Sequence, residues 1–199
     1  MIKVIYFDVG GVIVTDGFWR CKKQFAKMLG KSEADVWKAY LATDFPAYSA
    51  GTISPKQRWN AFFHKLKIKK YDFNKAMKIW HSVFKPIKGT MAVAKRMKSK
   101  GYKIGILSDQ AMDTLKTIKK RVNLSIFSPR IISSEVKLSK QDRRLRMYKL
   151  AVKRAGVKPS QILFIDNNKE HLADARKFGM KTLLFKSSKQ IKKVLSEMI

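Results

Sequence analysis

The chain has 199 residues, of which 45% are hydrophobic, so it is long enough to bury one sizeable core and too apolar for a disordered chain. It carries 44 Lys and Arg residues against 14 Asp and Glu residues, and the resulting net charge of +30 attracts anions such as phosphates and nucleic acids. Its single cysteine, Cys21, excludes an internal disulfide and a metal site built from several cysteines.

The basic residues are spread along the whole chain and form no separate tail. This spread predicts that they coat the solvent-facing sides of helices, with nucleic-acid binding as a less favoured alternative. No apolar run approaches the ~20 residues that span a bilayer, and the first residues lack the order of a signal peptide. We therefore expect no membrane partner and a cytoplasmic location.

Short apolar runs that end in a polar residue predict buried parallel strands. They are VIYFDVG (4–10), KIGILSD (103–109), ILFIDN (162–167) and TLLF (182–185). Helical patterns lie between them, at 89–101, 111–122, 143–156 and 170–179. Strands that alternate with helices in this way predict an α/β fold with a doubly wound parallel sheet.

Residues 15–84 interrupt this alternation with about four amphipathic helical patterns, and all four tryptophans fall within them. Ser32 and Ser54 are typical of residues that begin helices, because a polar side chain that can complete the cap follows three residues later. We predict an all-helical insertion over 15–84 with an aromatic core, and an α/β domain formed by 1–14 and 85–199.

Polar residues stand at the carboxyl ends of the predicted strands, where open α/β sheets bind their ligands. They are Asp8, Ser108, and Asp166 with Asn167, and Lys140 lies in a loop before a helix. This set offers a carboxylate nucleophile, a hydroxyl donor, a cation and further oxygen ligands. Such an inventory suits phosphoryl transfer, because the carboxylate attacks phosphorus while the cation and hydroxyl hold the phosphoryl oxygens.

Four segments resemble, in order and spacing, the four motifs of the haloacid dehalogenase-like hydrolase superfamily. They are FDVGGVIV, ILSDQ, SSEVKLSKQD and FIDNNKEHLADARKFGM. The segment YSAGTISPKQRW also resembles the start of a cap helix in that superfamily. The resemblance implies a Rossmann-like core that carries a helical cap, and it is strongest for the phosphatase-like subgroup.

The resemblance also implies roles for single residues. Asp8 matches the nucleophile that forms a phospho-aspartyl intermediate, and Ser108 and Lys140 match the groups that hold the phosphate. Asp166 and Asn167 match the pair that binds Mg²⁺ together with Asp8 and the backbone carbonyl two residues after it.

That carbonyl belongs to Gly10, and a glycine there admits a phosphate close to the backbone. With Gly11, Ser108, Asp109 and Lys140, Gly10 completes the predicted substrate-binding set.

Three positions depart from the common phosphatase pattern. Gly10 stands where most relatives carry an aspartate that acts as general acid and base, and losing such a group costs ~10²–10⁴ in rate. Asn167 stands where relatives commonly show a second aspartate, so the metal site has less charge. Asp109 stands where an asparagine is common, and its carboxylate would repel a phosphate unless it faces away or pairs with a lysine.

We expect a magnesium-dependent phosphatase that hydrolyses a small, sugar- or nucleotide-like phosphate monoester through an aspartyl phosphate. One alternative is a metal-free 2-haloacid dehalogenase, since those enzymes also lack an aspartate at the position of Gly10, and Trp19 or Trp37 could then hold the halide. The other is a catalytically degenerate protein that binds anions or RNA. The sequence gives no prediction of the oligomeric state.

Overall fold

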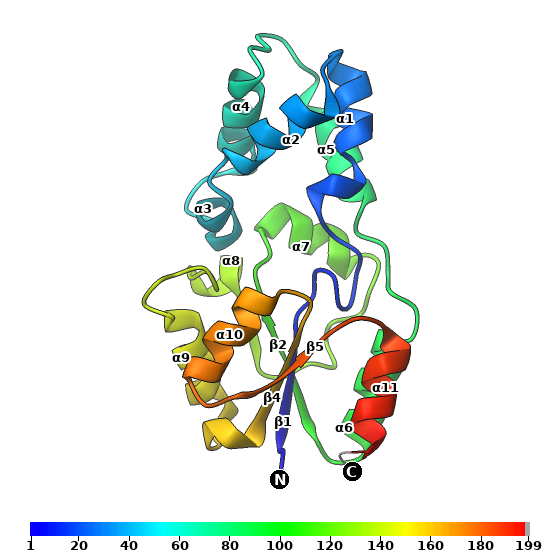
Figure 1. Ribbon diagram of the computed structural model, residues 1–199, viewed down its shortest axis with the longest axis vertical. Coiled ribbons are helices and arrows are strands. Elements are labelled where there is room, and N and C mark those ends of the chain that lie inside the picture. Colours follow the sequence, from blue (N-terminus) through cyan, green and yellow to red (C-terminus); the bar gives the residue numbers. More distant parts are fainter. Residues whose placement is uncertain (198–199) are drawn as a thin grey trace.

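The structure, a computed structural model, describes residues 1–197. Its centre is a five-stranded sheet in the order β3-β2-β1-β4-β5, and all neighbouring strands are parallel (Figure 1). The strands are β1 (Val4–Phe7), β2 (Lys103–Ser108), β3 (Arg130–Ile132), β4 (Ile162–Asp166) and β5 (Lys181–Leu184). The predicted doubly wound parallel sheet is confirmed. Strand β3 was not predicted, because its three residues are too few for a recognisable apolar run.

The sheet separates two hydrophobic clusters. Side chains alternate between the faces of a strand, so Val4 and Tyr6 of β1 enter one cluster while Ile5 and Phe7 enter the other. All four residues are buried, as expected for a central strand of a parallel sheet.

Helices cover both faces of the sheet (Figure 1). The cluster that contains Ile5 and Phe7 also includes residues of α6 (Thr90–Ser99), α7 (Met112–Lys119) and α11 (Ser188–Glu197). The opposite cluster includes residues of α9 (Arg146–Ala155) and α10 (Lys169–Lys177). The four predicted core helices are therefore present, and each is shorter than predicted. Helix α9 begins three residues later than predicted, after Leu145, whose φ of 52° is left-handed.

The segment between β1 and α6 is helical, and it lies above the carboxyl ends of the strands in Figure 1. It consists of η1 (Phe18–Arg20), α1 (Lys22–Leu29), α2 (Glu33–Leu41), α3 (Phe45–Ala50), α4 (Pro55–Lys65) and α5 (Phe73–Ser82). We call these helices the cap. The short elements α8 (Ser133–Val136) and η2 (Pro159–Gln161) complete the fold. Ser32 Oγ accepts from the Asp35 amide at 3.0 Å, and Ser54 Oγ accepts from the Gln57 amide at 3.2 Å, so both predicted helix starts are confirmed.

Aromatic rings form the interior of the cap, as predicted. Trp59 and Trp80 are buried, and both rings contact Phe18. Trp19 departs from the prediction, because it is 56% exposed. Arg58 is also buried, and its guanidinium lies over aromatic rings that attract a cation.

Two segments join the cap to the sheet and run side by side. The amide of Ile87 donates to the carbonyl of Ile13 at 2.9 Å, and the amide of Thr15 donates to the carbonyl of Lys85 at 2.7 Å. We call this pair, residues 13–15 and 85–87, the linker ribbon. The predicted insertion begins at residue 15, within the linker ribbon, and ends at residue 84, directly before its second segment. The division of the chain into two domains stays a prediction.

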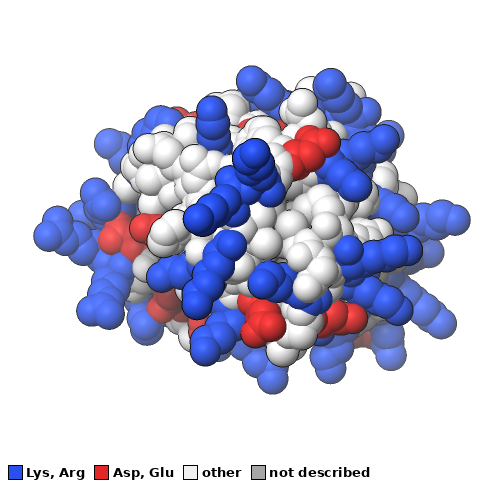
Figure 2. All heavy atoms as spheres, turned by 90° about the horizontal axis from the view of Figure 1, so that it is seen from above, with Lys and Arg blue, Asp and Glu red and all other residues white. Residues whose placement is uncertain are grey.

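On the face of the molecule that Figure 2 shows, basic side chains are spread out and do not gather in one place. Figure 2 shows Lys and Arg around the whole outline of the face that is seen from above. This distribution agrees with basic residues that coat solvent-facing helix sides. Among the helices of residues 1–197, none combines the length and the apolarity that crossing a bilayer requires.

The centre of the sheet gives a test of its packing at Gly105. A β-carbon placed on Gly105 would lie 2.6 Å from Tyr6 Cε1 and 2.7 Å from the Pro129 carbonyl oxygen. Because a backbone oxygen cannot rotate away, we expect Gly105→Ala to lower the free energy of unfolding by about 1–3 kcal/mol. Urea unfolding measures this change. Lys103→Ala, at the exposed start of the same strand, is the control and should change stability by less than about 0.5 kcal/mol.

Candidate active site

A buried lysine joins the ends of two neighbouring strands. Lys140 is 1% exposed, and its Nζ lies 3.0 Å from Asp8 Oδ1 and 2.7 Å from Asp166 Oδ2. Asp8 directly follows β1, Asp166 ends β4, and these strands pair in register. The structure thus brings together three residues that are 26 to 158 positions apart in the sequence.

Asp109 holds the loop that carries this lysine. Asp109 Oδ1 accepts from the Lys140 amide at 3.0 Å, and Asp109 Oδ2 accepts from Ser139 Oγ at 2.9 Å. Asp109 therefore pairs with the backbone of the lysine rather than with its ammonium. These hydrogen bonds give the carboxylate a positioning role that the sequence reasoning missed. Its predicted contact with substrate stays a prediction.

Ser108 lies at the buried end of β2, next to β1. Its Oγ accepts from the amide of Val9 at 3.3 Å, so the hydroxyl is fixed one residue away from the Asp8 carboxylate. A hydroxyl that accepts one hydrogen bond still has its own proton to donate. Ser108 can therefore donate to an oxygen bound beside Asp8.

Two further groups hold the Asp166 carboxylate. Asp166 Oδ1 accepts from the Asn168 amide at 2.8 Å, and Oδ2 lies 3.2 Å from His171 Nδ1. The sequence analysis did not assign His171 a role in the site. The signal that could have indicated it is the position of His171 in the first turn of α10, which begins three residues after Asp166.

The two glycines after Asp8 are covered by side chains from other segments. A β-carbon on Gly11 would overlap with the amide of Asn167. A β-carbon on Gly10 would overlap with Asp16 Oδ2 and would lie 3.0 Å from Gln110 Nε2. The sequence reasoning did not single out Asp16, and no local pattern connects it with Gly10.

Burial and charge act in opposite directions on the three acidic groups here. Burial raises the pKa of Asp8 to about 7, although Lys140 opposes the shift. Burial likewise raises the pKa of Asp16 to about 6. Burial also disfavours the Asp166 carboxylate, but Lys140 and His171 outweigh it and hold the pKa of that group well below its usual range. Asp166 is therefore the permanent anion of the site.

The predicted metal ligands offer only oxygen donors, which is the chemistry that Mg²⁺ requires. They are the carboxylates of Asp8 and Asp166, the carbonyl of Gly10 and the amide of Asn167. Asp8 Oδ1 is buried 3.0 Å from the Lys140 ammonium and has no other partner within residues 1–197, so a lone pair of this oxygen stays available to a metal. In that part of the chain, no group of three or more His, Cys, Asp or Glu side chains is placed to hold a metal. The set fits Mg²⁺ only if backbone, amide and water oxygens complete it.

A small cavity of about 80 Å³ separates the cap from the strand ends. Its walls include Asp16, Asp109 and Gln110 on the sheet side and Tyr40, Tyr48 and Trp80 on the cap side. Tyr48 Oη donates to Asp113 of α7 at 2.8 Å, and His81 Nε2 lies 3.2 Å from the same carboxylate. Ser133 Oγ donates to the Ser49 carbonyl at 2.7 Å. These polar contacts hold the cap closed over the cavity.

The family model of haloacid dehalogenase-like hydrolases matches residues 2–179. The chain belongs to the haloacid dehalogenase-like hydrolases. The resemblance seen in the four sequence motifs is thereby confirmed.

Relatives of this haloacid dehalogenase-like hydrolase include phosphatases and dehalogenases. The chain is 27% identical to a glyceraldehyde 3-phosphate phosphatase of Methanothermobacter thermautotrophicus, with 94% of this chain and 87% of the relative covered. It is 32% identical to (S)-2-haloacid dehalogenase 4A of Burkholderia cepacia, over only 44% of this chain and 38% of the relative.

Solved structures of this family share the fold at low sequence identity. A family enzyme of Bacteroides thetaiotaomicron, in complex with magnesium and inorganic phosphate, has a TM-score of 0.77 at 20% identity, and the match covers 94% of this chain and 96% of the other. An L-2-haloacid dehalogenase has a TM-score of 0.69 at 18% identity, and here the match covers 92% and 86%.

The burial of Asp8 gives a prediction for stability against pH. Its pKa is raised from about 4 in the unfolded chain to about 7 in the folded protein, so the folded state holds a proton that the unfolded state has lost. Wild-type stability should therefore fall as pH rises through this window. Asp8→Asn lacks this titration. The difference between its melting temperature and that of the wild type should therefore rise in favour of the variant from pH 4 to about pH 7, and stay constant at higher pH.

Melting curves in chelator measure this difference without bound metal ions. Ser160→Ala is the control, because residue 160 is exposed and neither serine nor alanine titrates in this range. Its melting temperature should follow that of the wild type at every pH. An Asp8→Asn curve that also runs parallel throughout would contradict the raised pKa.

Proposed function

We propose that this hydrolase cleaves a small phosphate monoester, sugar- or nucleotide-like, through an aspartyl-phosphate intermediate, with Mg²⁺ as cofactor. The observation that supports it most is the position of Lys140, whose Nζ lies within 3.0 Å of both Asp8 and Asp166. A dianionic phosphate beside Asp8 would be strongly repelled without a cation at this point.

In the proposed reaction Asp8 attacks phosphorus, and the bond from phosphorus to the ester oxygen breaks. Lys140 offsets the charge of the attacking carboxylate and of the phosphoryl oxygens. The Ser108 hydroxyl donates to one phosphoryl oxygen, and the backbone at Gly10 and Gly11 lets the phosphate approach closely. Water then cleaves the aspartyl phosphate and regenerates Asp8.

Asp8, the Gly10 carbonyl, Asp166 and Asn167 would hold the magnesium ion. When it is bound, Mg²⁺ supplies positive charge that neutralises the phosphoryl oxygens. Asp166 suits this task because its carboxylate stays ionised at all ordinary pH values.

One comparison supports a phosphate ester over a haloacid. The relative that is a phosphatase matches 94% of this chain, whereas the haloacid dehalogenase matches only 44% of it.

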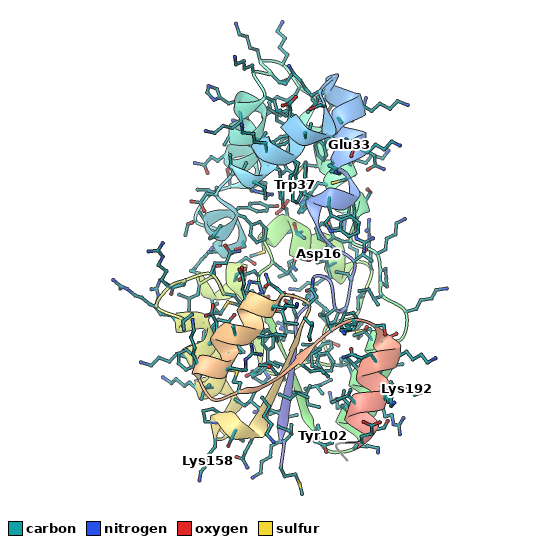
Figure 3. The ribbon with its side chains drawn as sticks, viewed as in Figure 1. Asp16, Glu33, Trp37, Tyr102, Lys158 and Lys192 are labelled. Carbon is teal, nitrogen blue, oxygen red and sulfur yellow. The ribbon has the colours of Figure 1, made fainter. Side chains whose placement is uncertain are left out.

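A dehalogenase is the second candidate, supported by the neutral Asn167, by the missing acid at Gly10, and by the partial match to a haloacid dehalogenase. The residues suggested for a halide cradle weigh against it. Trp19 is 56% exposed, and Trp37 stacks on Phe18 and Tyr40 inside the cap. Figure 3 shows Trp37 among the cap helices, away from the strand ends.

The proposal predicts that the protein hydrolyses p-nitrophenyl phosphate with Mg²⁺, and that Asp8→Asn loses this activity because an amide is no nucleophile. Nitrophenol release measures the rate, and chelator should abolish it. Lys153→Met removes an exposed cation of α9 and serves as the control for general charge, so it should keep the wild-type rate.

Three outcomes would overturn the proposal. The first is equal nitrophenol release by wild type and Asp8→Asn. The second is halide release from a 2-haloacid that persists in chelator, which would establish the dehalogenase. The third is salt-sensitive retention of RNA without hydrolysis of any ester, which would favour the degenerate binding protein.

A further inference from the structure

Cleavage of a phosphate ester leaves an alkoxide unless a nearby acid protonates the departing oxygen, and Gly10 has no side chain that could do so. Resting on the proposed function, we propose that Asp16, supplied by the segment that enters the cap, is the catalytic residue that donates this proton.

The position of Asp16 supports this role first. Its Oδ2 occupies the space that the side chain of residue 10 would enter, two residues after the Asp8 nucleophile. The carboxyl group of Asp16 therefore lies where the side chain of an aspartate at position 10 would lie. Gln110 Nε2 lies 3.0 Å from the position that a β-carbon of residue 10 would take.

The backbone around Asp16 is fixed on both sides. Before it, Thr15 is hydrogen-bonded to Lys85 in the linker ribbon, with the Lys85 amide donating to Thr15 Oγ1 at 2.9 Å. After it, Arg20 Nε donates to the Asp16 carbonyl at 3.0 Å. Figure 3 shows Asp16 between the cap helices and the sheet, which is where a leaving group must lie if the cap encloses it.

The other acids near the cavity are engaged elsewhere. Asp109 accepts from Ser139 and Lys140, and Asp113 accepts from Tyr48. Asp166 is paired with Lys140, and Asp8 is the nucleophile. The Asp16 carboxyl has no hydrogen-bond or ion-pair partner in the described part of the chain, although it lines the cavity.

The protons balance over the two steps, which are formation and hydrolysis of the aspartyl phosphate. As Asp8 forms its bond to phosphorus, the ester oxygen leaves with the proton of the Asp16 carboxylic acid, which gives an alcohol and the Asp16 carboxylate. A water then attacks the aspartyl phosphate and passes one proton to Asp16. Hydrogen phosphate leaves, and both carboxyl groups return to their starting states.

The test compares esters that differ in their need for a proton. A p-nitrophenolate leaves without help, whereas an alkoxide does not. Asp16→Asn should therefore lower kcat/KM for glycerol phosphate, an alkyl ester, by about 10²–10⁴ and for p-nitrophenyl phosphate by less than about tenfold. The value of kcat/KM is used because it reports formation of the aspartyl phosphate and not its later hydrolysis.

Two further variants complete the experiment. Asp72→Asn replaces an exposed helix-capping aspartate of α5 with a residue that caps equally well, and it should leave both values unchanged. The double change Gly10→Asp with Asp16→Gly moves the carboxyl group to residue 10. Compared with Asp16→Asn, it should restore part of kcat/KM for the alkyl ester.

Equal losses on both esters would assign Asp16 a structural role and overturn the inference while leaving the phosphatase intact. Unchanged rates on both esters would overturn it as well. If the wild type turns over neither ester, the proposed function itself fails and the inference with it.

Discussion

One ammonium group between two carboxylates determines the rest of this site. Burying Lys140 alone would carry a large desolvation penalty, and burying Asp8 and Asp166 together without a cation would add their repulsion. At 3.0 and 2.7 Å, the lysine makes both burials tolerable, and the carboxylates in turn keep the lysine charged. Because the three groups depend on one another, the strand ends, the loop held by Asp109 and the first turn of α10 share one fixed arrangement.

When Asp8 is ionised, this arrangement leaves one negative charge in excess, and the phosphate ester of the proposed reaction would bring two more. The proposed reaction therefore needs positive charge from outside the triad, and oxygen ligands at the ends of β1 and β4 are where a magnesium ion could provide it. The cap contributes no cation to the cavity wall. Its buried Arg58 lies against aromatic rings instead, so the cap shapes the space while the sheet provides the charge.

Much of this was readable in the sequence, because buried parallel strands are short apolar runs and their polar ends mark the crevice. The sheet, the core helices and the starts at Ser32 and Ser54 follow from such local patterns. Strand β3 is too short to give one. The contacts of Asp109 with the Lys140 loop and of Asp16 with Gly10 join segments through loop paths that have no periodicity, so only the structure reveals them. The catalytic roles of Asp8, Ser108 and Lys140 stay predictions, although the structure brings these residues together.

The linker ribbon has a geometric consequence. Two hydrogen-bonded segments resist shear between them, so any opening of the cap would be a rotation about the ribbon, and the contacts of Tyr48 and Ser49 on the far side would break first. Points on a rotation axis scarcely travel. Asp16 directly follows the ribbon, so its carboxyl would stay near Gly10 while the opposite rim swings wide enough to admit an ester and release an alcohol.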